Sequence, residues 1–243
     1  MAEEEHQKKN EFEKMDLVDH LDELRRRLIW SLAFIAAGSL AGWWIAPFLL
    51  DAITSGIEGS LQYFRPQDGF IWRLKLAMIV GVIIASPLII VQIWLFIKPA
   101  LTKSERRFAF PTIFSAIILF FGGCAFATLV VPYTLSFLEK FAGEAAKPHY
   151  SLDGYIGFVG MFILAFGIVF EVPVVLVLLA KLGIVSYEKL VQSRKYAILI
   201  SMIIGSLLTP ADPTSMFFLA VPLYTLFEAS LVIIRFMKKP GDS

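Results

Sequence analysis

The sequence predicts an all-α, polytopic membrane protein that crosses the bilayer six times, and three observations support this prediction. The 243-residue chain is 57% hydrophobic and only 18% charged, whereas soluble domains carry about 45–50% apolar and about 25% charged residues. Its mean hydropathy is +0.71. Nine of the 21 acidic and six of the 22 basic residues precede Leu28, and long apolar stretches with charged borders follow.

The first four apolar stretches each reach or approach the length of a transmembrane helix. About 20 residues cross about 30 Å of hydrocarbon at about 1.5 Å per residue. We expect the first stretch to end at Pro47, the second at Lys98 and the third at Pro132, whereas the fourth contains Glu171 and Pro173. The stretches are residues 28–46, 76–97, 108–131 and 155–180.

The last two stretches are expected to form short helices joined by a tight outer turn. Residues 196–208 number only 13, and residues 214–234 return across the membrane. A re-entrant segment is the alternative, but a true crossing is favoured by the basic residues that flank the pair: Arg194, Lys195, Arg235, Lys238 and Lys239. Such a pair must thin the local bilayer or extend its flanking side chains to the interface.

Lysine and arginine counts place both termini in the cytoplasm. Seventeen of the 22 basic residues fall in segment 1–27, in the loops after the second and fourth stretches, and in the tail 235–243. Because short cytoplasmic loops are enriched in Lys and Arg, we expect a single six-span membrane domain over residues 1–243, with segment 1–27 as a cytoplasmic amphipathic segment. The outer segments 47–73 and 132–154 are expected to lie on the membrane surface.

Two carboxylates on the predicted cytoplasmic side are candidates for binding a cationic partner. Glu23 lies in a segment with one helical stripe of leucines, formed by Leu17, Leu21, Leu24 and Leu28. This segment can equally be an interfacial helix whose arginines only anchor the first span. Glu105 is the sole acid in a loop with four basic residues, where it can stabilise the start of the next helix or bind a cationic ligand.

Glu171 is a carboxylate toward the middle of the fourth predicted span. A charge at that depth costs about 2.5–3.5 kcal/mol on insertion scales and indicates function by default, although a protonated, hydrogen-bonded Glu171 could also serve packing alone. Glu228 lies about two turns from the predicted cytoplasmic edge. Asp212 stands between two prolines, and turn chemistry alone can explain an aspartate there.

The sequence offers no set of residues for an enzyme, a metal or a nucleotide cofactor. The histidines are His6, His20 and His149, none in a predicted span, and Cys124 is the only cysteine. There is no glycine-rich phosphate loop, so direct use of ATP is not expected. A proton-coupled small-solute transporter using Glu171, and with it Glu228, is the alternative function, but the chain shows no internal repeat.

Short motifs occur in a fixed order along nearly the whole chain. They are HLDELRRRL (20–28), AP (46–47), SP (86–87), WLFIKPAL (94–101), ERR (105–107), AFGIVFEVP (165–173) and LTPAD (208–212). Each motif is weak alone, but together they resemble the TatC family of the twin-arginine protein translocase. The resemblance implies a concave, non-enzymatic six-helix bundle without cofactors, which receives folded substrates whose signal peptides carry an Arg-Arg pair.

The resemblance also implies roles for individual residues. The arginine pair would meet a site formed by Glu23, Phe96, Glu105, Arg106 and Arg107, and the apolar part of the signal would enter the concave side near Glu171. Four positions would serve outer architecture or partner contacts: Pro47, Thr209, Asp212 and Glu228. Some relatives have a glutamine early in the last span, where this chain has Ser215-Met216.

The partners implied are TatA- and TatB-type single-span proteins docking at the two short spans, signal peptides, the lipid bilayer and further copies of the chain, with no nucleic acid. The location implied is the bacterial cytoplasmic (inner) membrane, with transport driven by the protonmotive force.

Overall fold

The computed structural model describes residues 2–54, 61–101, 106, 108–142, 150–208 and 213–237. These residues are helical apart from short connections and one isolated parallel β-bridge between Gln62 and Ser151. An α-helical structure is expected here, because a segment in hydrocarbon must satisfy its own backbone hydrogen bonds. The elements are α1 (Ala2–Thr54), α2 (Asp68–Ile97), the 3-10 turn η1 (Lys98–Ala100), α4 (Ala109–Ala142), α5 (Leu152–Val169), α6 (Val172–Lys181), α7 (Tyr187–Gln192), α8 (Arg194–Leu208) and α9 (Pro213–Met237).

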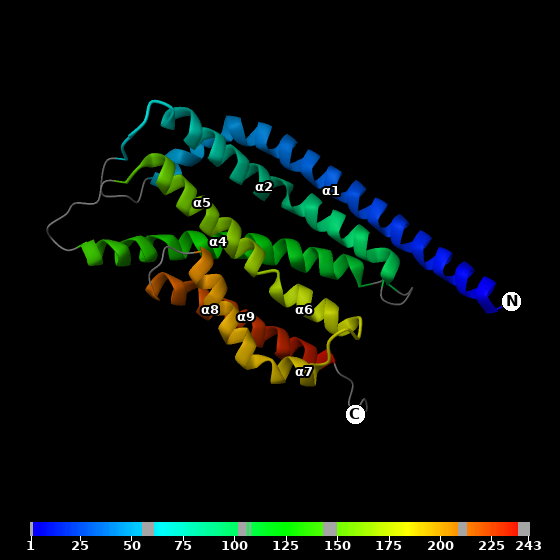
Figure 1. The fold of residues 1–243 in the computed structure, drawn as a ribbon. Coiled ribbons are helices and arrows are strands. Elements are labelled where there is room, and N and C mark those ends of the chain that lie inside the picture. Colours follow the sequence, from blue (N-terminus) through cyan, green and yellow to red (C-terminus); the bar gives the residue numbers. More distant parts are fainter. Residues whose placement is uncertain are drawn as a thin grey trace.

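The helices form an open, layered bundle (Figure 1). The pair α1 and α2 runs antiparallel along one edge, α4 and α5 pack beside it, and α8 with α9 forms the opposite edge. α1 begins and α9 ends toward the same side of the molecule, which agrees with the orientation expected from the basic residues.

Five of the described helical segments are long and apolar enough to cross a membrane: 20–54, 68–97, 109–136, 152–181 and 216–237. The fifth predicted stretch forms α8, whose 15 residues make it the shortest of the predicted spans. Arg194 and Lys195 stand at one end of α8, and in the sequence Thr209 and Pro210 follow its other end. The all-α, multi-pass class predicted from composition is confirmed.

Two predicted helix ends are wrong. α1 continues through Pro47 to Thr54, and α4 continues through Pro132 to Ala142. A proline removes one backbone donor and disturbs one turn, but neighbouring packing can maintain the helix in a membrane protein. Packing is present at both places, since Ala46 and Val131 are buried in the core.

Segment 1–27 is not a separate interfacial helix. It belongs to the 53-residue helix α1, which spans about 80 Å at about 1.5 Å per residue. Within the described side chains, Leu21, Leu24 and Leu28 of the predicted apolar stripe are exposed. α1 therefore carries its polar N-terminal half well beyond the bundle in one continuous direction.

The fourth predicted span is interrupted at Glu171. α5 ends at Val169 and α6 starts at Val172, and the Glu171 amide donates to the Ile168 carbonyl at 3.0 Å in a tight turn. Pro173 lacks an amide hydrogen and so cannot continue the regular α-helical bonding pattern through this turn. The regular helix of the fourth span is therefore broken at Glu171, two residues before Pro173.

Aromatic residues of α5 form the centre of the bundle. Phe162 and Phe166 are fully buried with ring centroids 5.2 Å apart, and Phe126 of α4 lies 5.5 Å from Phe166. These rings fill the space between α4 and α5.

Small residues bring α1 and α2 into backbone contact. A Cβ added at Gly38 would lie 2.6 Å from the Gly81 carbonyl oxygen, and one at Gly42 would lie 2.5 Å from the Ala77 carbonyl oxygen. The spacing Gly38-x-x-x-Gly42 is the pattern that permits close helix approach in membranes. The register of α1 on α2 is therefore fixed at these glycines.

We predict that Gly42→Ala destabilises the protein, because the new methyl group meets backbone and not a flexible side chain. Overpacking of this kind costs about 1–3 kcal/mol. The matched control is Gly122→Ala in α4, where an added Cβ meets nothing within 4 Å. Thermal unfolding of the detergent-solubilised variants measures the difference, and equal midpoints would contradict the assigned contact.

Candidate functional site

The first polar cluster lies where α1 passes the end of α2. Arg27 donates from Nε to Glu23 Oε1 at 2.7 Å and from Nη1 to Gln92 Oε1 at 3.0 Å. Its Nη2 lies 2.5 Å from the same Glu23 oxygen. One turn along each helix, the His20 and Phe96 rings stack with centroids 4.4 Å apart. The cluster thus joins two sequence-distant segments, residues 20–27 and 92–96.

This cluster contains two of the predicted site residues and three that sequence reasoning did not select. Glu23 and Phe96 were predicted, whereas His20, Arg27 and Gln92 were not. The helical spacing holds the signal that could have found them, because His20, Glu23 and Arg27 repeat at intervals of three and four on one face, as do Gln92 and Phe96.

The loop after α2 is described only in part. Arg106 donates from Nε to the Leu101 carbonyl at 3.2 Å, and Leu101 is buried. Glu105 and Arg107 lie outside the described residues, so their predicted part in the site stays a prediction.

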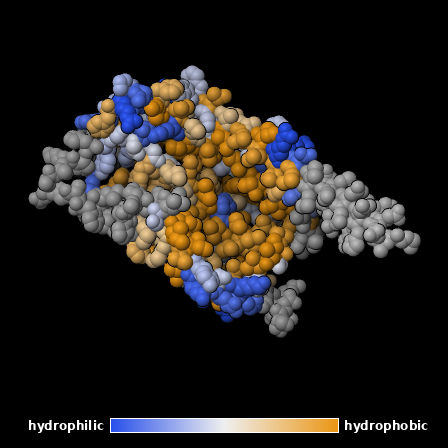
Figure 2. Space-filling model, viewed as in Figure 1, coloured by the Kyte–Doolittle hydropathy of each residue, from blue (hydrophilic) through white to orange (hydrophobic). Residues whose placement is uncertain are grey.

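Glu171 borders an apolar groove between α2, α4 and α6 that holds about 550 Å³ of empty space. Figure 2 shows a broad hydrophobic face with a hydrophilic patch near its centre, where α5 gives way to α6 in Figure 1. The Oε1 atom of Glu171 is buried and has no hydrogen-bond partner among the described residues. The groove is lined by Ile90, Ile93, Trp94, Ile97, Thr112, Ile113, Ala116, Glu171, Val174, Val175 and Leu178.

An ion pair near the other end of α2 joins this helix to α5. Lys75 of α2 lies 2.6 Å from Asp153 of α5, and Arg73 donates to the Trp43 carbonyl at 3.2 Å from α2 to α1. The outer segments also meet, because the Gln62 amide donates to the Tyr150 carbonyl at 3.1 Å. These contacts tie α1, α2 and α5 together, and none was predicted.

Tyr150 also makes a side-chain hydrogen bond in this outer region. Its hydroxyl donates to Glu139 at 2.7 Å, and burial, followed by this carboxylate, raises the pKa of the phenol. Tyr150 therefore stays a neutral donor throughout the physiological range.

Glu228 is held by a local network. Arg194 donates from Nη2 to Glu228 Oε2 at 2.8 Å, and the Tyr224 hydroxyl donates to Oε1 at 2.8 Å. These bonds join α8 to α9. Pro47 is half-buried within α1, whereas Thr209 and Asp212 lie outside the described residues.

The fold and these sites define a class: a multi-pass, all-α membrane protein with a polar cluster at one end and an apolar groove containing one carboxylate. Comparison with known proteins makes the class specific. Residues 19–222 match the family described as "Sec-independent protein translocase protein (TatC)". The chain belongs to the TatC family, and it is a translocase subunit, not an enzyme.

Relatives and solved structures agree with this assignment. The TatC proteins of Carboxydothermus hydrogenoformans and Escherichia coli are 38% and 36% identical to the chain, covering 92% and 93% of it and 94% and 90% of their own lengths. A crystal structure of a twin-arginine translocase receptor, TatC, superposes with a TM-score of 0.81 at 37% identity, covering 89% of this chain and 98% of that one.

We predict that Lys75→Met destabilises the protein more than the double variant Lys75→Met/Asp153→Asn. The single change leaves a half-buried carboxylate without its cation, which costs about 1–3 kcal/mol, whereas the double change removes that charge as well. Thermal unfolding in detergent measures all variants, with Asp153→Asn completing the cycle. Additive effects would show that the pair contributes no coupling.

Proposed function

We propose that this TatC-family subunit binds twin-arginine signal peptides on its cytoplasmic face and nucleates the complex that exports folded proteins across the bacterial cytoplasmic membrane. The observation that carries the proposal is the Glu23 cluster, in which a carboxylate already engages a guanidinium where α1 passes the end of α2. A site that holds one arginine has the shape and charge to hold another.

The specificity for a pair of arginines would come from two carboxylates on separate segments. Glu23 would meet one guanidinium and Glu105, in the neighbouring loop, the other, with Phe96, Arg106 and Arg107 completing the site. Arginine binds carboxylates through a planar fork that lysine lacks. A Lys-Lys sequence therefore forms fewer bonds with the same two groups.

The apolar part of the signal would occupy the groove beside Glu171. The groove opens near the Phe96 end of α2, since Trp94 and Ile97 line it. A chain that binds its arginines at the Glu23 cluster can then continue directly into this apolar lining. Glu171, the ionisable residue among those that line the groove, would contact a signal peptide that has entered deeply.

TatA- and TatB-type single-span helices are proposed to dock along α8 and α9. The described side chains of α8 expose apolar residues, among them Ile198, Leu199, Ile200 and Ile203, and α8 is short for a membrane span. A longer helix beside it would cover this surface, and the locally thinned bilayer would favour such a contact. Both termini would lie in the cytoplasm, and self-association would complete the complex.

We predict that Glu23→Gln and Glu105→Gln each weaken crosslinking of a twin-arginine signal peptide to the solubilised complex, and that Lys-Lys signals already crosslink poorly to the wild type. Loss of a charge-assisted bond corresponds to a weakening of about tenfold or more per site. Asp22→Asn, which removes an exposed carboxylate beside Glu23, is the control. Undiminished crosslinking in the double variant would reject the assigned site.

We predict that Glu171→Ala leaves the arginine contact intact but impairs transport. The readout is export of a folded twin-arginine substrate in a TatC-deficient strain of a related system, with crosslinking at the Glu23 site measured in parallel. Val175→Ala removes a side chain of similar position in the same groove without removing charge, and it should retain export. Normal export by Glu171→Ala would show that Glu171 serves only the packing of the helices.

A further inference from the structure

We propose that Arg27 is an internal occupant of the arginine site, which holds the Glu23 carboxylate in the resting chain and releases it when a signal arginine binds. The inference rests on the proposed function, because it concerns the same carboxylate. It assigns Arg27 a role in setting the affinity of the site, with Gln92 as the acceptor that retains Arg27 after the exchange.

The geometry shows an arginine that is fully engaged. Nε and Nη2 both contact Glu23 Oε1, and Nη1 donates to Gln92 Oε1 at 3.0 Å. All three guanidinium nitrogens thus face an acceptor: two of them share one oxygen on α1, and the third faces an oxygen on α2. A signal arginine must therefore compete with an equivalent group for Glu23 and cannot simply add to a free carboxylate.

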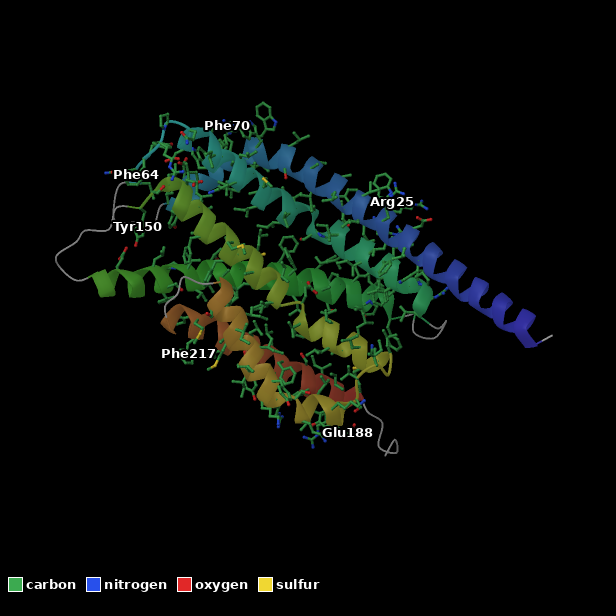
Figure 3. The ribbon with its side chains drawn as sticks, viewed as in Figure 1. Arg25, Phe64, Phe70, Tyr150, Glu188 and Phe217 are labelled. Carbon is green, nitrogen blue, oxygen red and sulfur yellow. The ribbon has the colours of Figure 1, made fainter. Side chains whose placement is uncertain are left out.

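The two neighbouring arginines do not share this arrangement. Arg25 and Arg26 are exposed, and within the described part of the chain neither has a hydrogen bond or ion pair to a carboxylate. Figure 3 shows Arg25 on the side of α1 that faces away from α2. Three consecutive arginines therefore divide into one that is turned to the site and two that are turned outward.

Partial burial gives the internal pair its strength. The side chains of Arg27 and Glu23 are 22% and 27% exposed, so solvent screens their attraction less than at an open surface. Glu23 Oε2, in contrast, accepts no hydrogen bond from any described residue. An incoming guanidinium can thus make a first bond to Oε2 before Arg27 leaves Oε1.

The exchange favours arginine over lysine. Replacing one guanidinium by another conserves charge-assisted N–H···O bonds to the carboxylate, whereas an ammonium group lacks the planar set of donors. Arg27 must leave Glu23 for either ligand, so it lowers both affinities alike and sets a threshold that an arginine ligand passes more readily than a lysine ligand. The preference for arginine itself comes from the stronger bond of the ligand to Glu23.

The test is the affinity of the full-length, detergent-solubilised protein for two synthetic signal peptides, one with Arg-Arg and one with Lys-Lys. Arg27→Gln should bind the Arg-Arg peptide about two- to tenfold more tightly, the range expected for removing a partly screened competing ion pair. The Lys-Lys peptide should gain by a similar factor, because both ligands are freed of the same competitor. Arg27→Lys should show the same changes to a smaller extent.

Arg26→Gln is the matched control, because it removes the same charge one residue away without touching Glu23. It should change both affinities less than Arg27→Gln does. In a Glu23→Gln background, Arg27→Gln should have no larger effect than Arg26→Gln. Melting temperatures of all variants check folding, and Arg27→Lys carries the test if Arg27→Gln does not fold.

Weaker Arg-Arg binding by both Arg27→Gln and Arg27→Lys would overturn the inference, because Arg27 would then position Glu23 and not compete for it. That result differs from a failure of the proposed function. If the wild type binds both peptides equally, or if Glu23→Gln changes neither affinity, the site itself is wrong and the inference falls with it.

Discussion

The close contact between α1 and α2 is the constraint on which the candidate site depends. α2 is the principal neighbour of α1, and Gly38, Gly42 and Gly81 allow the two backbones to touch. With the two backbones in contact, neither helix can slide along or rotate against the other without a steric clash. The register set at these glycines therefore carries Glu23 and Arg27 to the level of Gln92, several turns away.

The same helix pair links polar recognition to the apolar groove. One face of α2 presents Gln92 and Phe96 to α1, while Ile90, Trp94 and Ile97 line the groove toward α4 and α6. The Lys75–Asp153 pair joins α2 to α5, and the aromatic centre of α5 packs against α4. A ligand with a cationic start and an apolar continuation thus finds both of its environments on adjacent faces of one rigid helix.

The sequence predicted the fold class well, because apolar stretches with charged borders follow directly from the boundary between hydrocarbon and water. Helix ends were predicted less well at Pro47 and Pro132, where tertiary packing maintains a helix that local chemistry would end. At Glu171 the local signal sufficed, since Pro173 and an intramembrane carboxylate both mark a break. The engagement of Glu23 by Arg27 and Gln92 could not be predicted, because it requires knowing which turn of α2 faces α1, and that register is set by distant glycines.

The central claim is that a signal arginine occupies the Glu23 carboxylate at the junction of α1 and α2. The most direct measurement is a cryo-electron microscopy structure of the assembled complex with a bound twin-arginine signal peptide. The account predicts a signal guanidinium on Glu23, with Arg27 turned away from it and still bonded to Gln92. An unchanged Glu23–Arg27 pair, with the signal arginines bound elsewhere, would contradict it.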